Sequence, residues 1–216
     1  GIEGNDYAYH DRDRLIDPTM HLSFKTLAYA GAQPNSLKVK YSTDYDGTQT
    51  ETAINDATWN DLTSSFALSP IEAGTSSPYT DSGEVDITTL YPESTPLYVG
   101  FFYTVEIGTV DGRTQVELAN ATIEARTPAG STKTSEQCET TLPIIVGRSY
   151  EDNDDKTTPL YGTNSTQKNE RLLFRSSYRP TEQRLAYAVT GPLRPGEPQN
   201  LGTDQPAVLK AENDPQ

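Results

Sequence analysis

Residues 97–125, LYVGFFYTVEIGTVDGRTQVELANATIEA, constrain the fold of this chain more than any other stretch. The opening segment, LYVGFFY, is apolar or aromatic at nearly every position, which is typical of a strand buried on both faces. Residues 116–123 read as a second strand. Between the two strands lies Asp111-Gly112, a pair that accepts the positive φ angles of a tight hairpin turn. The stretch therefore predicts a hairpin at the centre of an antiparallel β domain.

Two other segments alternate apolar and polar residues with the period of a half-buried strand. Met20, Leu22 and Phe24 mark the first, and a second one runs through residues 37–41. No long window has the apolar spacing of an amphipathic helix, so the sequence predicts an all-β protein. Residues 48–55 read as a loop. Shorter patterns predict strands at 85–87, 142–146, 172–174 and 185–189, and a single helical turn at 88–91.

The length of 216 residues suits one β-sandwich domain over residues 1–216. Only 33% of the residues are hydrophobic, which indicates a modest core with long polar loops. The 13 tyrosines add area that packs while the hydroxyl stays in water. Residues 128–141 are rich in Ser and Thr and read as an internal loop or linker. Residues 192–216 are rich in Pro and read as an extended tail.

The formal net charge of −14 argues against a nucleic-acid partner, because an acidic surface repels a polyanion. Solubility is the simplest explanation of this acidity. No apolar run is long enough for a transmembrane helix. The single cysteine, Cys138, leaves neither an intrachain disulfide nor a cysteine-based metal cage. Residues 1–4, GIEG, resemble neither a signal peptide nor a methionine start, so we expect a trimmed or mature fragment whose targeting segment is not seen.

Several blocks carry a family resemblance. NDYAYHDRDR, LSFKTLAYAGAQPNSLKVKYSTDYDG and SGEVDI followed by PLYVGFFYT occur in this order. They resemble a domain-of-unknown-function family, DUF5017, of surface lipoproteins from gut Bacteroidales, and similar blocks occur in jelly-roll domains of secreted adhesins. The resemblance covers roughly the first 125 residues and is looser beyond them, where Ala186-Tyr187 stands in place of a usual tryptophan. It implies a galactose-binding-like jelly roll on the outside of the outer membrane, and it implies no activity.

Catalysis has little support in the sequence. The two histidines, His10 and His21, have no paired Ser-Asp or Cys spacing that suggests a triad, and His21 falls on the polar face of a strand. A pair of carboxylates for glycoside hydrolysis carries no signal among 31 acidic residues, because some pair will always lie close. We therefore expect a protein that is not an enzyme. A glycan-degrading enzyme is the third alternative, after the two non-catalytic roles given below.

Calcium is the one cofactor that the sequence suggests. Oxygen ligands clustered in loops are what Ca²⁺ requires. Asp44 and Asp46 lie at a predicted strand end, and Asp152 and Asp154 belong to an acidic run. Neither group has the EF-hand spacing, and a solvated acidic turn is the alternative explanation of both. A structural Ca²⁺ thus remains a hypothesis from these four residues.

Aromatic side chains in loops suggest a glycan-binding surface. Sugar platforms use exposed aromatic faces beside carboxylates and amides, and Tyr7, Tyr9, Tyr29, Tyr45 and Tyr79 lie in or near predicted loops. Each ring fits equally well at the edge of the core with its hydroxyl in water. We expect a non-catalytic cell-surface module that binds a carbohydrate or another extracellular ligand. The main alternative is a structural or adhesive module that contacts a surface protein and has no small-molecule site.

Overall fold

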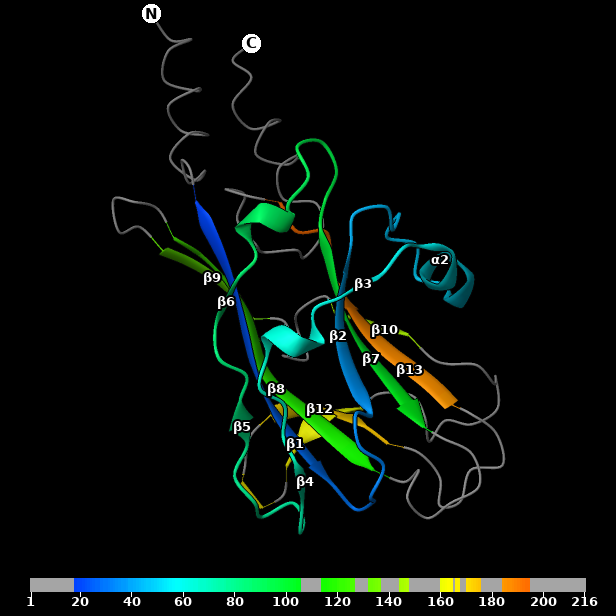
Figure 1. Ribbon diagram of the computed structural model, residues 1–216, viewed down its shortest axis with the longest axis vertical. Helices are drawn as coiled ribbons and strands as arrows, with labels where there is room; N and C mark the ends of the chain where they lie inside the picture. The colour runs from blue at the N-terminus through cyan, green and yellow to red at the C-terminus, as the bar shows by residue number, and fades with distance from the viewer. Residues whose placement is uncertain are drawn as a thin grey trace, which may run out of the picture.

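Two β-sheets face each other in the computed structural model, which describes residues 18–105, 114–126, 132–136, 144–147, 160–164, 166–167, 170–175 and 184–194. In Figure 1 the layer that contains β1 and β8 lies to the left, and the layer with β2, β7 and β13 lies to the right. The sequence prediction of an all-β sandwich is confirmed.

Sheet A is built on β1 (Thr19–Tyr29) and β8 (Gln115–Arg126), which pair antiparallel over their whole length. A β-bulge at Asn120, which has a φ of 51°, places two residues of β8 opposite Phe24. The remaining strands of sheet A in the described chain lie beside these two: β4 (Ile71–Glu72), β5 (Thr80–Asp81) and β6 (Val85–Asp86) on β1, β9 (Thr132–Glu136) and β12 (Glu170–Phe174) on β8, and β11 (Leu160–Thr163) on β12.

Sheet B has β7 (Tyr98–Val105) at its centre, paired antiparallel with β2 (Leu37–Ser42) and with β13 (Arg184–Thr190). Its outer strands are β3 (Asn60–Asp61) and β10 (Ile144–Gly147). The helix α2 (Glu51–Asp56) and two 3-10 turns, η1 (Thr63–Ser65) and η2 (Thr88–Leu90), belong to the connections.

The main core lies between the sheets. Met20, Leu22 and Phe24 of β1 are buried and alternate with half-buried polar residues, as the period of two predicted. Strand β7 is buried on both faces: Phe101 points into the main core, and Phe102 packs on the outer side beneath α2. A second cluster covers this outer side of sheet B: Tyr45, Ile54, Tyr98, Phe102, Tyr187 and Val189.

The predicted hairpin across Asp111-Gly112 is wrong. Strand β7 belongs to sheet B and β8 to sheet A, and no pairing joins them. The turn itself lies outside the described residues. The two strands of a hairpin pair with each other, whereas β7 pairs with β2 and β13, and β8 pairs with β1, β9 and β12. The connection therefore passes from one layer of the sandwich to the other.

Helix α2 begins within residues 48–55 and ends at Asp56, so the predicted loop there is wrong. Thr50 caps the helix, since its hydroxyl accepts a hydrogen bond from the Ala53 amide at 3.2 Å. Ile54 is the buried residue of this short helix and anchors it in the second cluster. One apolar anchor gives no periodic pattern, which explains the error. Strand β9 lies within 128–141, the predicted linker, while the predicted helical turn at 88–91 agrees with η2.

Candidate functional site

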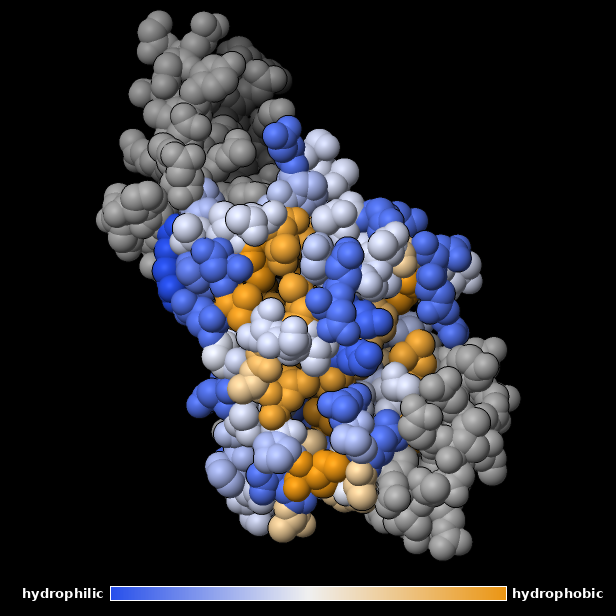
Figure 2. Space-filling model, in the orientation of Figure 1, coloured by the Kyte–Doolittle hydropathy of each residue, from blue (hydrophilic) through white to orange (hydrophobic). Residues whose placement is uncertain are grey.

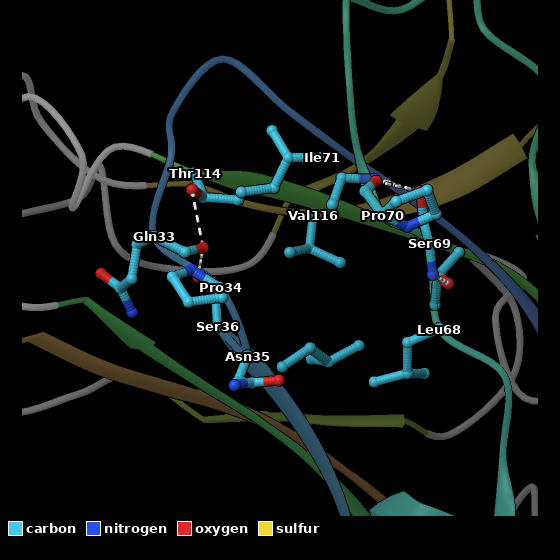
Figure 3. Close-up of a pocket in the computed structure, with 13 residues that line it drawn as sticks. Gln33, Pro34, Asn35, Ser36, Leu68, Ser69, Pro70, Ile71, Thr114 and Val116 are labelled. Carbon is cyan, nitrogen blue, oxygen red and sulfur yellow. Dashed lines mark hydrogen bonds between the residues drawn. The ribbon is translucent and has the colours of Figure 1, made fainter.

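A pocket of about 220 Å³ opens at the rim of the sandwich, beside the turn that joins β1 to β2. Figure 3 shows it between that turn, the segment that leads into β4, and the start of β8. On the face of the molecule shown in Figure 2, apolar side chains are exposed among polar ones. They extend to the end of the molecule at which Figure 1 labels β4. The lining residues are Thr26, Ala28, Gln33, Pro34, Asn35, Ser36, Leu37, Leu68, Ser69, Pro70, Ile71, Thr114 and Val116.

The turn between β1 and β2 forms one wall of this rim pocket, and backbone contacts fix its shape. Ala30 and Asn35 both have positive φ, 68° and 55°. A Cβ on Gly31 would lie 2.2 Å from the Thr114 backbone nitrogen, so only glycine allows this approach. The Gln33 carbonyl accepts a hydrogen bond from the Thr114 hydroxyl at 3.0 Å. The turn is thus attached directly to the beginning of β8.

The opposite wall is the segment from Leu68 to Ile71. Ser69 is tied to β1 twice: its amide donates to Thr26 Oγ1 at 2.9 Å, and its Oγ accepts from the Ala28 amide at 3.1 Å. Ile71 then pairs with Ala28 in the short parallel ladder of β1 and β4. Ile71 is 38% exposed, which makes it the one large hydrophobic residue classed as exposed in the described chain.

The chemistry of the rim pocket is neutral. None of the lining residues that the structure describes is ionisable, although the chain carries a net charge of −14. The hydroxyls of Ser36, Ser69 and Thr114 already donate to backbone carbonyls. Within the part of the chain that the structure describes, the Asn35 side-chain amide makes no hydrogen bond. Asn35 therefore offers a donor and an acceptor to a ligand, and the aliphatic side chains offer apolar contact.

A buried carboxylate lies behind this pocket, on the outer face of sheet A. Glu117 of β8 is 1% exposed and follows the pocket-lining Val116. Its Oε1 accepts a hydrogen bond from the Tyr29 hydroxyl at 2.9 Å. Its Oε2 accepts from the Asn164 amide at 2.8 Å and from the Tyr79 hydroxyl. Arg171 Nε lies 3.6 Å from Oε1. We call Glu117 with these four partners the Glu117 cluster.

The cluster keeps its tyrosines protonated. Burial raises the pKa of Tyr29 well above its usual range, and the charge and hydrogen bond of Glu117 add to this effect. The same causes, with burial again the largest, raise the pKa of Tyr79. A phenol that donates to a carboxylate loses that bond on ionisation and gains repulsion instead, which explains both directions. The arrangement suits a structural anchor, since Glu117 has almost no contact with solvent.

The three described tyrosines of the predicted aromatic surface do not lie together. Tyr29 and Tyr79 lie over sheet A in the Glu117 cluster, whereas Tyr45 is buried over sheet B against Trp59 and Tyr98. Tyr29 ends a strand and Tyr45 is buried, so neither is a loop side chain open to solvent. Tyr7 and Tyr9 lie outside the described residues. Among aromatic residues whose exposure is described, none is exposed, and Tyr41, Trp59, Tyr79 and Tyr91 are half-buried.

The two described candidate calcium ligands serve the turn after β2. Asp44 Oδ1 accepts from the Thr58 amide and the Ser42 hydroxyl, both at 2.8 Å, and these bonds lower the pKa of Asp44. Asp46 Oδ1 accepts from the Thr48 amide at 2.7 Å. Asp152 and Asp154 lie outside the described residues. Among the residues described, no group of three or more His, Cys, Asp or Glu side chains is placed to hold a metal ion.

Sequence reasoning missed both the rim pocket and Glu117. One signal was available for Glu117, a charged residue between Val116 and Leu118 inside an apolar strand, because a buried charge requires partners. No comparable signal existed for the pocket. Its lining comes from three separate segments of ordinary turn and strand residues, and only the pairing of β1 with β4 and β8 brings them together.

These features define an all-β sandwich protein with a small neutral pocket at its rim. Residues 1–142 match the family described as "Domain of unknown function (DUF5017)", and the chain belongs to this family. No curated protein and no solved structure matches the chain. Within the described residues, no helix is both long enough and apolar enough to cross a membrane.

Proposed function

We propose that this chain is a non-catalytic binding module of a bacterial cell-surface lipoprotein, and that its ligand enters the rim pocket. The observation that carries the proposal is that the described lining of this pocket is uncharged in a strongly acidic chain. Such a lining selects a neutral group, because a charge would be desolvated there without a partner. A neutral carbohydrate of an extracellular glycan is the ligand class we favour.

The size and chemistry of the pocket support one sugar ring. A cavity of about 150 Å³ admits a benzene molecule, so the observed volume of about 220 Å³ admits one ring-sized group. Leu68 and Ile71 offer apolar contact to the C–H face of a ring, and the Asn35 amide offers hydrogen bonds to its hydroxyls. Among the described lining residues, none can transfer a proton as a catalytic acid or base at neutral pH, which supports binding rather than turnover.

A second candidate is the structural or adhesive module that contacts a surface protein. One observation favours it: the part of the lining that the structure describes holds no aromatic ring on which a sugar could stack. An aliphatic side chain of a protein partner would fit the same walls. The distinction between the two candidates is therefore whether a soluble neutral glycan binds at all.

A glycan array followed by isothermal titration calorimetry tests the proposal. We expect a neutral glycan to bind, and Asn35→Gly to weaken the binding at least fivefold. Glycine keeps the positive φ of this position without strain, so the change removes only the amide. Asn120→Gly is a matched control, because Asn120 has a similar φ of 51° and lies outside the pocket. Absence of binding across neutral plant and host glycans would favour the adhesive module, and turnover of a glycan would revive the enzyme.

A further inference from the structure

The pocket wall and the Glu117 cluster belong to one continuous segment, residues 68–79, which we call the strap. The strap begins at Leu68, lines the rim pocket as far as Ile71, and pairs with the end of β1 through β4. It then turns at Gly74, where the Ser77 amide donates to the Gly74 carbonyl at 3.1 Å. It ends at Tyr79, whose hydroxyl donates to Glu117. One end of the strap thus faces the pocket and the other is bound to the carboxylate.

The described side-chain anchors of the outer half of the strap lead to Glu117, to its partner Asn164, or to the turn after Asn164, where Thr75 Oγ1 lies 3.3 Å from Thr166 Oγ1. Tyr79 binds Glu117 directly. The Asn164 amide donates to Glu117 and to the Thr75 carbonyl, the latter at 3.4 Å. Asn164 Oδ1 accepts from the Gln167 amide at 2.9 Å, and the Gln167 side chain donates to the carbonyls of Thr75 and Ser77. Glu117 and the turn at Asn164, which donates to it, therefore attach the loop between β4 and β5 to sheet A.

The inner half of the strap is held to the same strand pair. Tyr29, which donates to Glu117 Oε1, pairs with Glu72 of β4. The residue before it, Ala28, lines the pocket and pairs with Ile71. Because side chains alternate along a strand, Glu117 and Tyr29 point to the outer face of sheet A while Val116 and Ala28 point inward. The carboxylate and the pocket are thus on opposite faces of the same two strands.

The surroundings of Glu117 require a carboxylate. Tyr79, Tyr29 and Asn164 donate hydrogen bonds to it, and the positive charge of Arg171 lies 3.6 Å away. A carboxylate only accepts hydrogen bonds, with about four lone-pair positions, so it matches these donors. A glutamine has nearly the same shape but would present its own N–H₂ donors to one side of the cluster. The guanidinium of Arg171 has no acceptor, and Asn164 could present its oxygen only by losing the bonds that Oδ1 accepts from the Thr166 and Gln167 amides.

We propose that Glu117 is a positioning residue for the rim pocket: from the opposite face of sheet A, it holds the strap and so places the wall formed by Leu68–Ile71. The proposal rests on the proposed function only in naming the pocket as the binding site. Glu117 itself does not touch the ligand. It sets the distance between the strap and the turn at Asn35, and with it the affinity of the pocket.

Amide hydrogen exchange under native conditions tests the mechanical part. In Glu117→Gln we expect the amides of Ser69 and Ser77 to exchange at least tenfold faster than in the unmodified chain, while core amides of β7 change no more than in the control. Glu124→Gln is the matched control, since Glu124 lies on the same strand and pairs with Arg126 instead. Unchanged strap exchange, or an equal acceleration of strap and core, would overturn the proposal.

Two tyrosine variants separate the strap from the strand. Tyr79→Phe removes the bond from the strap to Glu117, and Tyr29→Phe removes the bond from β1 to the same carboxylate. We expect Tyr79→Phe to accelerate exchange at Ser77 more than Tyr29→Phe does. Equal effects of the two variants would show that the cluster stabilises the sheet as a whole, and they would contradict the assignment.

Access to the pocket gives a readout that needs no ligand. A thiol introduced as Leu68→Cys in a Cys138→Ser background reports the opening of the wall, because Leu68 is half-buried there. We expect its alkylation to be at least threefold faster when Glu117→Gln is added, and an unchanged rate would contradict the proposal. If a glycan binds equally well with and without Glu117→Gln while the strap is loosened, Glu117 does not set the pocket. If no glycan binds any variant, the proposed function fails while the exchange and thiol results still decide this inference.

Discussion

Tyr29 and Tyr79 donate hydrogen bonds to the two different oxygens of one buried carboxylate, that of Glu117. Tyr29 is the last residue of β1, and Tyr79 immediately precedes β5. A single acceptor therefore joins the central strand of sheet A to the loop that folds across its outer face. Because the two phenols share this acceptor, their contributions to stability are expected to depend on each other.

A double-mutant cycle on these two tyrosines measures that dependence. Each Tyr→Phe change removes a hydrogen bond to a charged group, which typically costs about 1.5–3 kcal/mol. After the first change Glu117 keeps the hydrogen bonds of its other partners. After the second change it also loses the other phenol, so fewer hydrogen bonds offset the cost of burying its charge. We expect the double variant to differ from the sum of the single ones by about 0.5–3 kcal/mol in urea unfolding. Additivity within about 0.3 kcal/mol would show that the two bonds act independently.

Replacing Gly31 by alanine should destabilise the protein by about 1–3 kcal/mol. The new Cβ would lie 2.2 Å from the backbone nitrogen of Thr114, so the turn must move away from β8. Gly74→Ala is the control, since a Cβ there meets nothing within 4 Å and the residue has no positive φ. Thermal unfolding of both variants checks the prediction. Equal loss in both would mean that glycine matters for some other reason than this contact.

Alkaline unfolding is expected between about pH 10 and pH 12. Burial raises the pKa of Tyr45 to about 12, against about 10 for a tyrosine in the unfolded chain. Above pH 10 the unfolded state therefore holds fewer protons than the native state, so stability falls as the pH rises. Absorbance of tyrosinate near 295 nm, followed together with circular dichroism, measures this. The buried phenols should ionise only as the β signal is lost, and ionisation of all 13 tyrosines in one step near pH 10 with an unchanged signal would contradict it.

Stability is also expected to fall below about pH 4. Hydrogen bonds from Thr63 lower the pKa of Asp61, and those from Thr88 lower the pKa of Asp86. A lowered pKa in the native state means that the unfolded state binds more protons than the native state in this pH range. The contribution of these carboxylates to stability is therefore complete above the unfolded pKa of about 3.9, and it is lost as the pH falls through their native pKa. Urea midpoints at pH 7 and pH 3 measure the loss. Asp61→Asn should make the loss smaller, and an unchanged pH dependence would exclude Asp61 as a contributor.

Calcium is expected not to bind at the turn that contains Asp44 and Asp46. Both carboxylates already accept hydrogen bonds from that turn or from Thr58. Thermal unfolding in Ca²⁺ and in EGTA gives the test, since a ligand at 100 times its Kd stabilises a protein by about 2.7 kcal/mol. Any response to Ca²⁺ should survive in Asp44→Asn and Asp46→Asn. Loss of the response in these variants would place a calcium site there.

The strands that the sequence predicted are those whose own pattern of apolar residues shows which faces are buried. Met20, Leu22 and Phe24 alternate because one face of β1 meets the core, and the apolar run in β7 reflects burial on both faces. What patterns did not reveal is which strands pair. The apolar residues of β7 and β8 suit either one shared sheet or two facing sheets. The hairpin prediction therefore depended on Asp111-Gly112 alone, and it was wrong because the two strands belong to different sheets.

The candidate site depends on contacts between distant parts of the chain, and this is why sequence reasoning did not find it. Glu117 is one of 31 acidic residues, and its donors come from β1, the strap and the turn after β11. The tyrosines were predicted to form a sugar-binding surface, but Tyr29 and Tyr79 lie in the Glu117 cluster. Their side chains face a carboxylate of the same chain instead of a ligand.

The order in which sheet B is completed matters during protein synthesis. Strand β7 finds β2 already made, but its second neighbour, β13, is translated last of all the described strands. Until the ribosome has added Arg184–Thr190, the nascent chain presents an apolar strand with one bare edge, the kind of surface that invites aggregation. Sheet B therefore stays incomplete, with one edge of β7 unpaired, until β13 has been made.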